Sequence, residues 1–148
     1  MRNAAGKLAD ISAASVALRT LRAARGAAIA DFDNDGRIDI AVNNNDEPPL
    51  LLRNESTAGN WLAIELAGTK SHRDAIGAVV KLTDKTGRKQ WQILTTASSY
   101  LSASQKRLHF GLGATDGVRD IEIRWPSGGV QVVRNPGINR KVTIRESQ

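Results

Sequence analysis

Residues 31–39 carry the strongest chemical signal in the chain, because they read Asp-Phe-Asp-Asn-Asp-Gly-Arg-Ile-Asp. Carboxylates stand at positions 1, 3, 5 and 9 of this stretch, as Asp31, Asp33, Asp35 and Asp39. Calcium is bound in proteins by about six to eight oxygen atoms, and a tight loop of alternating aspartates supplies them. Carboxylates this close together repel one another unless a cation neutralises them. The spacing therefore predicts a calcium site.

The other positions of the loop fit the same interpretation. Gly36 permits a sharp turn in mid-loop, and Arg37 is expected to contribute its backbone carbonyl as a ligand. The stretch is not an EF-hand, since Val42 stands where that motif needs Glu, and the closing ligand would be Asp39. Magnesium is disfavoured because the ligands are all supplied by the protein. The alternative is a solvated, Asp-rich turn that binds no metal.

The residues around the loop predict strands rather than helices. Ala27-Ala28-Ile29-Ala30 leads into it, and Ile38, Ile40 and Val42 alternate with other residues on the way out. The same period of two, or a run bounded by turn residues, recurs along the chain. It predicts strands near 27–31, 38–43, 61–67, 77–83, 90–96, 107–111 and 141–146, and a hairpin over 118–134. We expect an all-β fold, an antiparallel sandwich or barrel-like domain.

The chain divides into three parts in this interpretation. Residues 1–24 are an Ala- and Arg-rich lead-in or linker, residues 25–52 hold the aspartate loop, and residues 53–148 form the β domain. The middle part is too small for a core of its own. It is therefore expected to pack on the larger part or against something else.

Charge and composition exclude several classes of function. The net charge is +6, but six of the 15 acids lie within residues 31–47, where Arg37 is the one cation. The remaining cations are scattered and few aromatic residues accompany them, so no nucleic-acid partner is predicted. There is no cysteine for a thiolate or disulfide, and no run of about 18 apolar residues for membrane insertion.

Several stretches resemble known families. Residues 25–42 look like an FG-GAP/VCBS repeat, the calcium-binding hairpin of β-propeller blades, and the sequence that follows resembles the ASPIC/UnbV domain of the cartilage acidic protein family. The stretches that carry the second resemblance keep the family's order: Leu50-Leu51-Leu52-Arg53-Asn54, Asn60-Trp61-Leu62, Arg73-Asp74-Ala75-Ile76-Gly77-Ala78, Ser99-Tyr100-Leu101-Ser102, His109-Phe110-Gly111-Leu112-Gly113 and Trp125-Pro126-Ser127-Gly128.

The resemblance implies a secreted, periplasmic or cell-surface protein in which several propeller repeats precede the ASPIC/UnbV domain. This chain would then be the C-terminal part of a longer protein. The family brings no established catalytic residues to carry over, so no catalytic residue is predicted. Two departures stand out, since the family usually has Asn where this chain has His72 and Gln where it has Ala103. We therefore expect a non-enzymatic, calcium-binding extracellular module for binding or adhesion, with an unidentified protein or glycan partner.

The alternative function is a hydrolase acting on a glycan or an acidic polymer. It needs two carboxylates about 5–10 Å apart, one of them with a raised pKa. The acids considered for this role are Glu55, Glu65, Asp74, Asp84, Asp116, Asp120, Glu122 and Glu146. A cleft that holds two of them would favour the enzyme.

Three weaker candidates have plainer interpretations that we prefer. The triplet His72-Arg73-Asp74 is expected to form a surface-loop salt bridge, because no nucleophile motif accompanies it. Gly111-Leu112-Gly113 is too short to hold a phosphate and predicts a β-bulge or turn. The tryptophans Trp61, Trp91 and Trp125 would suit a sugar-stacking platform, but their alternating strands favour core packing.

Overall fold

The structure is a computed structural model that describes residues 2–4, 7–10, 13, 16–57 and 59–148. Within the predicted lead-in, β1 (Arg2–Ala4) and β2 (Lys7–Ala9) form an antiparallel pair, and α1 (Val16–Arg19) is a single helical turn. Among these described residues, no helix has the length and apolar character needed to span a membrane.

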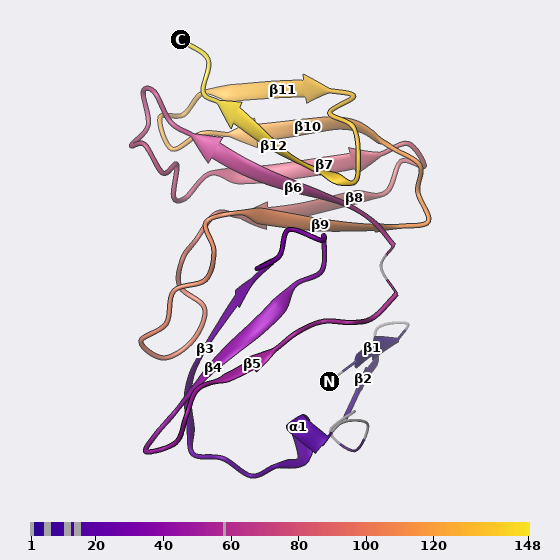
Figure 1. Cartoon of the computed structure of the whole chain (residues 1–148). Coiled ribbons are helices and arrows are strands. Elements are labelled where there is room, and N and C mark those ends of the chain that lie inside the picture. The colour runs from indigo at the N-terminus through magenta and orange to yellow at the C-terminus, as the bar shows by residue number, and fades with distance from the viewer. Residues whose placement is uncertain (1, 5–6, 11–12, 14–15, 58) are drawn as a thin grey trace.

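Seven strands form two facing sheets, which lie at the top of Figure 1. The four-stranded sheet has the order β11-β10-β7-β8, and the three-stranded sheet has the order β12-β6-β9. Every pairing is antiparallel except that of β12 with β6, which is parallel. The predicted all-β, sandwich-like class is confirmed. The strands are β6 (Asn60–Ala67), β7 (Val79–Asp84), β8 (Lys89–Ile93), β9 (Leu108–Gly113), β10 (Val118–Arg124), β11 (Val130–Arg134) and β12 (Arg140–Arg145).

The hydrophobic core lies between these two sheets. Alternate residues of each strand point inward, as a period of two requires, so that Ile64 of β6, Phe110 of β9 and Ile121 of β10 are fully buried. The described members of the core cluster all fall between Leu62 and Ile144. This apolar interior makes the sandwich the stable frame of the molecule.

Glutamine side chains join the two sheets where strand pairing stops. Gln90 and Gln92 of β8 donate from Nε2 to the carbonyls of Gly111 (3.0 Å) and His109 (2.7 Å) in β9. On the other side, Gln131 of β11 donates to the carbonyl of Arg145 in β12 (3.2 Å). Within residues 59–148, which are fully described, side-chain amides thus bridge both seams of a sandwich that does not close into one continuous ladder.

The core packing predicted for Trp125 is confirmed, whereas that predicted for Trp91 is wrong, and the glutamines of β8 explain why. Trp125 is 4% exposed, whereas Trp91 is 68% exposed. Since β8 turns Gln90 and Gln92 toward β9, Trp91 between them must point to the opposite, solvent-facing side. Trp61 is half-buried and lies at the boundary with the smaller sheet.

The smaller sheet consists of β3 (Ala24–Ala30), β4 (Asp39–Asn44) and β5 (Leu50–Leu52) in sequence order, all antiparallel. It lies below the sandwich in Figure 1. The aspartate loop connects β3 to β4, as predicted, and β5 is an additional short strand.

The outer edge of β3 is covered by the long connection between β8 and β9. The Ser98 hydroxyl donates to the Ala27 carbonyl (3.2 Å), and Gln105 N donates to the Ile29 carbonyl (3.1 Å). In the other direction, Ile29 N donates to Ser104 Oγ (3.1 Å). A loop of the sandwich therefore satisfies the edge strand of the smaller sheet.

Two of the plainer interpretations are confirmed. Asp74 pairs with Lys106 (2.5 Å) on the surface, and the register of β6 and β9 shifts where Asn60 pairs with Gly113 and Trp61 with Gly111. The first is a surface-loop salt bridge, and the second is a β-bulge.

Candidate metal site

Three carboxylates of the aspartate loop converge on one point. Asp31, Asp33 and Asp39 each place an oxygen atom within 4.8 Å of those of the other two. Asp31 directly follows β3, and Asp39 begins β4, where it pairs with Ala30. The pairing of the two strands thus brings the ends of the loop together. Asp31 and Asp39 are buried, while Asp33 is exposed.

The backbone of the loop holds the Asp31 carboxylate in place. Asp35 N donates to Oδ1 (3.0 Å) and Gly36 N donates to Oδ2 (3.1 Å). The chain folds back over Asp31 because Asn34 and Gly36 have positive φ angles of 57° and 86°, a conformation that favours these two residue types.

Asp39 is held in the same way from two sides. Phe32 N donates to its Oδ2 (3.1 Å), and Asn54 N donates to its Oδ1 (2.8 Å). Asn54 follows β5 and also donates from Nδ2 to the Ile38 carbonyl (3.3 Å). A carboxylate has about four acceptor sites, so these bonds fix its orientation and leave acceptor capacity for a cation.

Asp33 faces an arginine from the segment after β5. Arg53 donates to Asp33 Oδ2 from Nη2 (2.9 Å) and from Nε (3.2 Å). Desolvation by neighbouring groups opposes ionisation of the carboxylate, but hydrogen bonds, led by that from Arg53, outweigh it and lower the pKa of Asp33. Asp33 is therefore ionised at neutral pH and forms an ion pair with the guanidinium group of Arg53.

Asp35 and Arg37 form an ion pair with each other beside the three-carboxylate cluster. Arg37 N also donates to Asp35 Oδ1 (2.8 Å), and Arg37 Nε donates to the Asn54 carbonyl (2.6 Å). Of the five predicted metal-binding residues, the structure brings three aspartates together and pairs the other two residues with each other. The use of the Arg37 carbonyl as a ligand stays a prediction.

The sandwich contacts the loop through an aromatic pair. The ring of Trp61 stacks on that of His109, with centroids 5.7 Å apart and planes 16° apart. Gly36 lies so close to this pair that a Cβ atom there would be 2.0 Å from Trp61 Nε1. Glycine is thus needed at position 36 both for its φ angle and for its contact with the indole. Arg107 adds a second support by donating to Asn34 Oδ1 (2.9 Å).

His109 lies in an unusual environment for an imidazole. Burial lowers its pKa, Asp31 works in the opposite direction, and Arg107 lowers it further. Its Nδ1 atom is buried and has no hydrogen-bond partner among the described residues. A neutral ring suits the stacking contact with Trp61, because it brings no buried charge.

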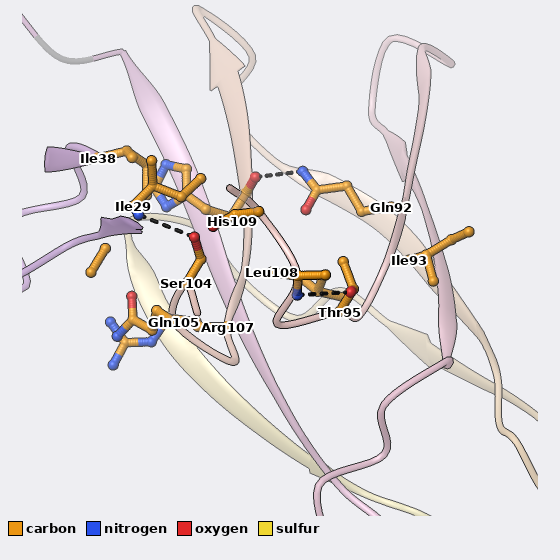
Figure 2. Close-up of a pocket in the computed structure, with 13 residues that line it drawn as sticks. Ile29, Ile38, Gln92, Ile93, Thr95, Ser104, Gln105, Arg107, Leu108 and His109 are labelled. Carbon is orange, nitrogen blue, oxygen red and sulfur yellow. Dashed lines mark hydrogen bonds between the residues drawn. The ribbon is translucent and has the colours of Figure 1, made fainter. Parts of the chain in front are cut away.

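Two hollows adjoin the site besides one of about 310 Å³ that is lined by Gly36, Arg37, Asn54 and Trp61. One of about 170 Å³ opens beside the carboxylates and is lined by Phe32, Asp33, Asp39, Leu51 and Arg53. The other, of about 250 Å³, lies at the junction of the smaller sheet with the sandwich. Figure 2 shows Ser104 bonded to Ile29 across the junction and Gln92 bonded to the His109 backbone within the sandwich. The first hollow gives access to the cluster, and the second belongs to the packing between the two units.

The residues that position the cluster were not predicted from the loop sequence. Arg53 and Asn54 lie 14 and 15 positions beyond Asp39, and Trp61 belongs to the first strand of the sandwich. Only the family resemblance could have pointed to them, since Arg53-Asn54 and Asn60-Trp61 belong to two of the stretches that carry it. Their spacing alone carries no metal-binding pattern.

A comparison with family models matches residues 68–148 to the family described as ASPIC and UnbV, which is more than half of the chain. The chain belongs to this family. Its matched region begins within the loop after β6 and covers most of the sandwich. The aspartate loop and the smaller sheet lie before it, so their likeness to an FG-GAP/VCBS repeat stays a prediction.

Curated relatives share this similarity over a longer stretch. The chain is 32% identical to "Cartilage acidic protein 1" of Mus musculus over 107 residues, which are 70% of this chain and 16% of the relative. The protein of the same name from Homo sapiens gives 32% over 107 residues with the same coverage, and that from Xenopus tropicalis gives 31% over 109 residues. The aligned part is thus about one sixth of each relative.

Proposed function

We propose that this protein is a non-enzymatic, calcium-binding extracellular module for binding or adhesion, and part of a larger repeat protein. The observation that carries the proposal is the convergence of Asp31, Asp33 and Asp39. Three carboxylates drawn together at the junction of two strands are poorly tolerated without a cation between them. A bound ion would neutralise this charge and cross-link the loop.

The geometry of the cluster suits calcium. In proteins, the oxygens that bind calcium lie about 2.3–2.6 Å from the ion, so two ligand oxygens on opposite sides of it are about 5 Å apart. The three carboxylates, each within 4.8 Å of the others, fall inside that limit. Asp31, Asp33 and Asp39 would hold the ion, and the adjoining hollow of about 170 Å³ leaves room for water oxygens to complete its shell.

The smaller sheet supports the assignment to a repeat protein. Ile29 and Ile40 are paired on one face and are 47% and 38% exposed, while Leu51 on the other face is 62% exposed. A three-stranded sheet with apolar residues on both faces is marginal without cover. Propeller repeats preceding this segment would supply neighbours for both faces, and the relatives are about six times longer than the part matched here.

The proposed location follows from the relatives. Their name refers to cartilage, a tissue that consists largely of extracellular matrix. A secreted, periplasmic or cell-surface location is also where calcium is abundant enough to occupy a modest site. The partner proposed for such a module is a protein or a glycan.

The hydrolase alternative needs two carboxylates in one cleft, and the hollow that holds two of the candidate acids does not supply a suitable pair. Glu65 and Asp74 line a shared surface hollow with Lys106. Glu65 is paired with Arg107 (3.1 Å), and hydrogen bonding to Lys106 lowers the pKa of Asp74. A general acid needs the opposite, a raised pKa, so the non-enzymatic function is preferred.

Isothermal titration of the full chain with calcium chloride tests the proposal. We expect one binding site per chain, with Asp33→Asn weakening the affinity at least about tenfold because one charged ligand is lost. Asp116→Asn is the matched control, since the Asp116 side chain is 82% exposed and lies far along the chain from the loop. Absence of calcium binding to the wild type, or an equal loss in Asp116→Asn, would overturn the site.

A further inference from the structure

The outer face of the four-stranded sheet presents a group of cations beside an exposed aromatic ring. Arg124 of β10, Lys81 of β7 and Lys89 of β8 point outward, as does Trp91. We call these four residues the basic tryptophan face. It lies on strands of the sandwich within the family-matched region.

The strand register fixes the spacing of the cations. Arg124 pairs with Val79 and Lys81 pairs with Trp91. Lys81 is therefore the diagonal neighbour of Arg124, and Lys89, two residues before Trp91, is the diagonal neighbour of Lys81. Diagonal neighbours on one face are about 7–8 Å apart. The three cations form a line across three adjacent strands.

The charges along this line are available to a ligand. Among the described residues, no ion pair or side-chain hydrogen bond engages Lys81, Lys89 or Arg124. Of the acids on the same face, Asp120 is bound by Arg119 (2.7 Å), and Glu122 is half-buried opposite Lys81. Unpaired cations in a regular row are complementary to a polyanion.

Trp91 adds a feature that a charged row alone does not have. Its side chain is 68% exposed and stands directly opposite Lys81, on β8, the last strand in the order of this sheet. An exposed tryptophan offers an apolar ring face with a polar N–H at its edge. The apolar C–H face of a sugar ring stacks on such a surface while its anionic groups reach the neighbouring cations.

We propose that the basic tryptophan face binds an anionic polysaccharide, one bearing sulfate or carboxylate groups, with one sugar on Trp91 and its anionic groups on the cation line. This names a ligand class for the binding module proposed above, and it rests on that extracellular role. Single-stranded nucleic acid is disfavoured because its bases stack on successive aromatic rings, and the described outer-face residues of these strands include one aromatic ring, Trp91.

The test is binding of the full chain to a heparin oligosaccharide, measured at several salt concentrations. As with nucleic-acid phosphates, each cation that pairs with an anionic group of the ligand is expected to make the plot of log affinity against log salt steeper by about one unit. The double variant Lys81→Gln, Lys89→Gln should therefore lower that slope by about two and weaken binding at least about tenfold at low salt. Trp91→Ala should weaken binding several-fold with the slope unchanged. Lys70→Gln is the control, as an exposed cation outside the face.

Each outcome decides the proposal. No binding to heparin by the wild type, no effect of Trp91→Ala, or an equal effect of Lys70→Gln would overturn it, as would tighter binding to a DNA oligonucleotide of equal charge. Circular dichroism of each exposed-residue variant verifies that it remains folded. Asp33→Asn separates the two proposals, since it should weaken calcium binding at least about tenfold and leave heparin binding intact.

Discussion

The sandwich and the smaller sheet have opposite interiors. Between Leu62 and Ile144 the sandwich buries a continuous set of apolar side chains, whereas the buried side chains from β3 to β5 include the carboxylates Asp31 and Asp39 and the amide of Asn44. The first unit is stabilised by removing apolar surface from water. The second depends on hydrogen bonds, on its contact with the sandwich and, in our proposal, on a cation.

The two units also treat a buried carboxylate differently. Glu146, 4% exposed, accepts three backbone N–H bonds from Thr69, Lys70 and Ser71 at 2.7–2.9 Å, together with the hydroxyls of Ser71 and Ser127. The sandwich thus satisfies one anion entirely with protein donors. The aspartate loop instead gathers three anions at one point, which is the arrangement that our proposal assigns to a bound cation.

The largest expected effect comes from the core of the sandwich. Phe110 is fully buried, so Phe110→Ala should cost about 3–5 kcal/mol of unfolding free energy through lost burial and the cavity left behind. Ile29→Ala on the exposed face of the smaller sheet should cost roughly 1 kcal/mol or less. Urea unfolding measures both. Equal losses would mean that the two units do not differ as described.

A second prediction concerns the contact between the units. Gly36 and Gly87 have nearly the same φ, 86° and 89°, but only Gly36 would bring a Cβ against other atoms, namely those of Trp61. Gly87→Ala should cost about 1–2 kcal/mol for the left-handed backbone alone. Gly36→Ala should cost more and also shift the tryptophan emission. Similar stability and emission in the two variants would contradict the proposed packing of the loop on Trp61.

The third prediction concerns the loss of stability at low pH, which depends on Glu146. Burial opposes ionisation of Glu146, but hydrogen bonds led by those from Ser127 and Ser71 lower its pKa from 4.5 to about 2. A lowered folded-state pKa stabilises the protein above the unfolded value, and this stabilisation is lost as pH falls from about 4.5 to 2. Glu146→Gln should lower the melting temperature at pH 7 by a few degrees and flatten this dependence.

Melting curves from pH 7 to pH 2 measure this effect. Glu55→Gln, in an exposed position between the units, is the control and should keep the wild-type profile. A variant at Glu146 with the wild-type pH profile would show that the clamp does not contribute to stability.

The smallest expected effect is on calcium affinity. Arg53 binds Asp33 at 2.9 Å and competes with an incoming cation for that carboxylate. Removing one such charge is worth about 1 kcal/mol in an exposed setting, so Arg53→Ala should tighten calcium binding about fivefold. Arg22→Ala, which breaks the separate pair with Glu47, should leave the affinity unchanged. Weaker binding in Arg53→Ala would indicate that Arg53 organises the site rather than competing with the ion.

Local sequence patterns predicted much of the fold, but partners distant in the chain were not predictable. The turn Pro126-Ser127-Gly128-Gly129 and its alternating flanks predicted the hairpin of β10 and β11, since turn chemistry is local. Nothing in the alternation of Val142 and Ile144 indicated that β12 would pair in parallel with β6. Pairing between strands some 80 residues apart depends on packing and not on local pattern.

The same limit applies to the candidate site and to Trp91. The loop pattern predicted that four aspartates would converge, and three of them do. It did not predict that Asp35 would pair with Arg37 or that Arg53 would reach Asp33. An alternating strand reveals two faces without showing which is buried. In β8 the polar face turns inward, because Gln90 and Gln92 have carbonyl partners in β9.

Amide hydrogen exchange of the full chain, with and without calcium, tests the central contrast most directly. The amides of Asp35 and Gly36, which donate to Asp31, should become markedly more protected when calcium is added, and magnesium at equal concentration should have less effect. The core amides of β9 and β10 should exchange at the same slow rate in both conditions. Identical exchange of the loop amides with and without calcium would contradict the account.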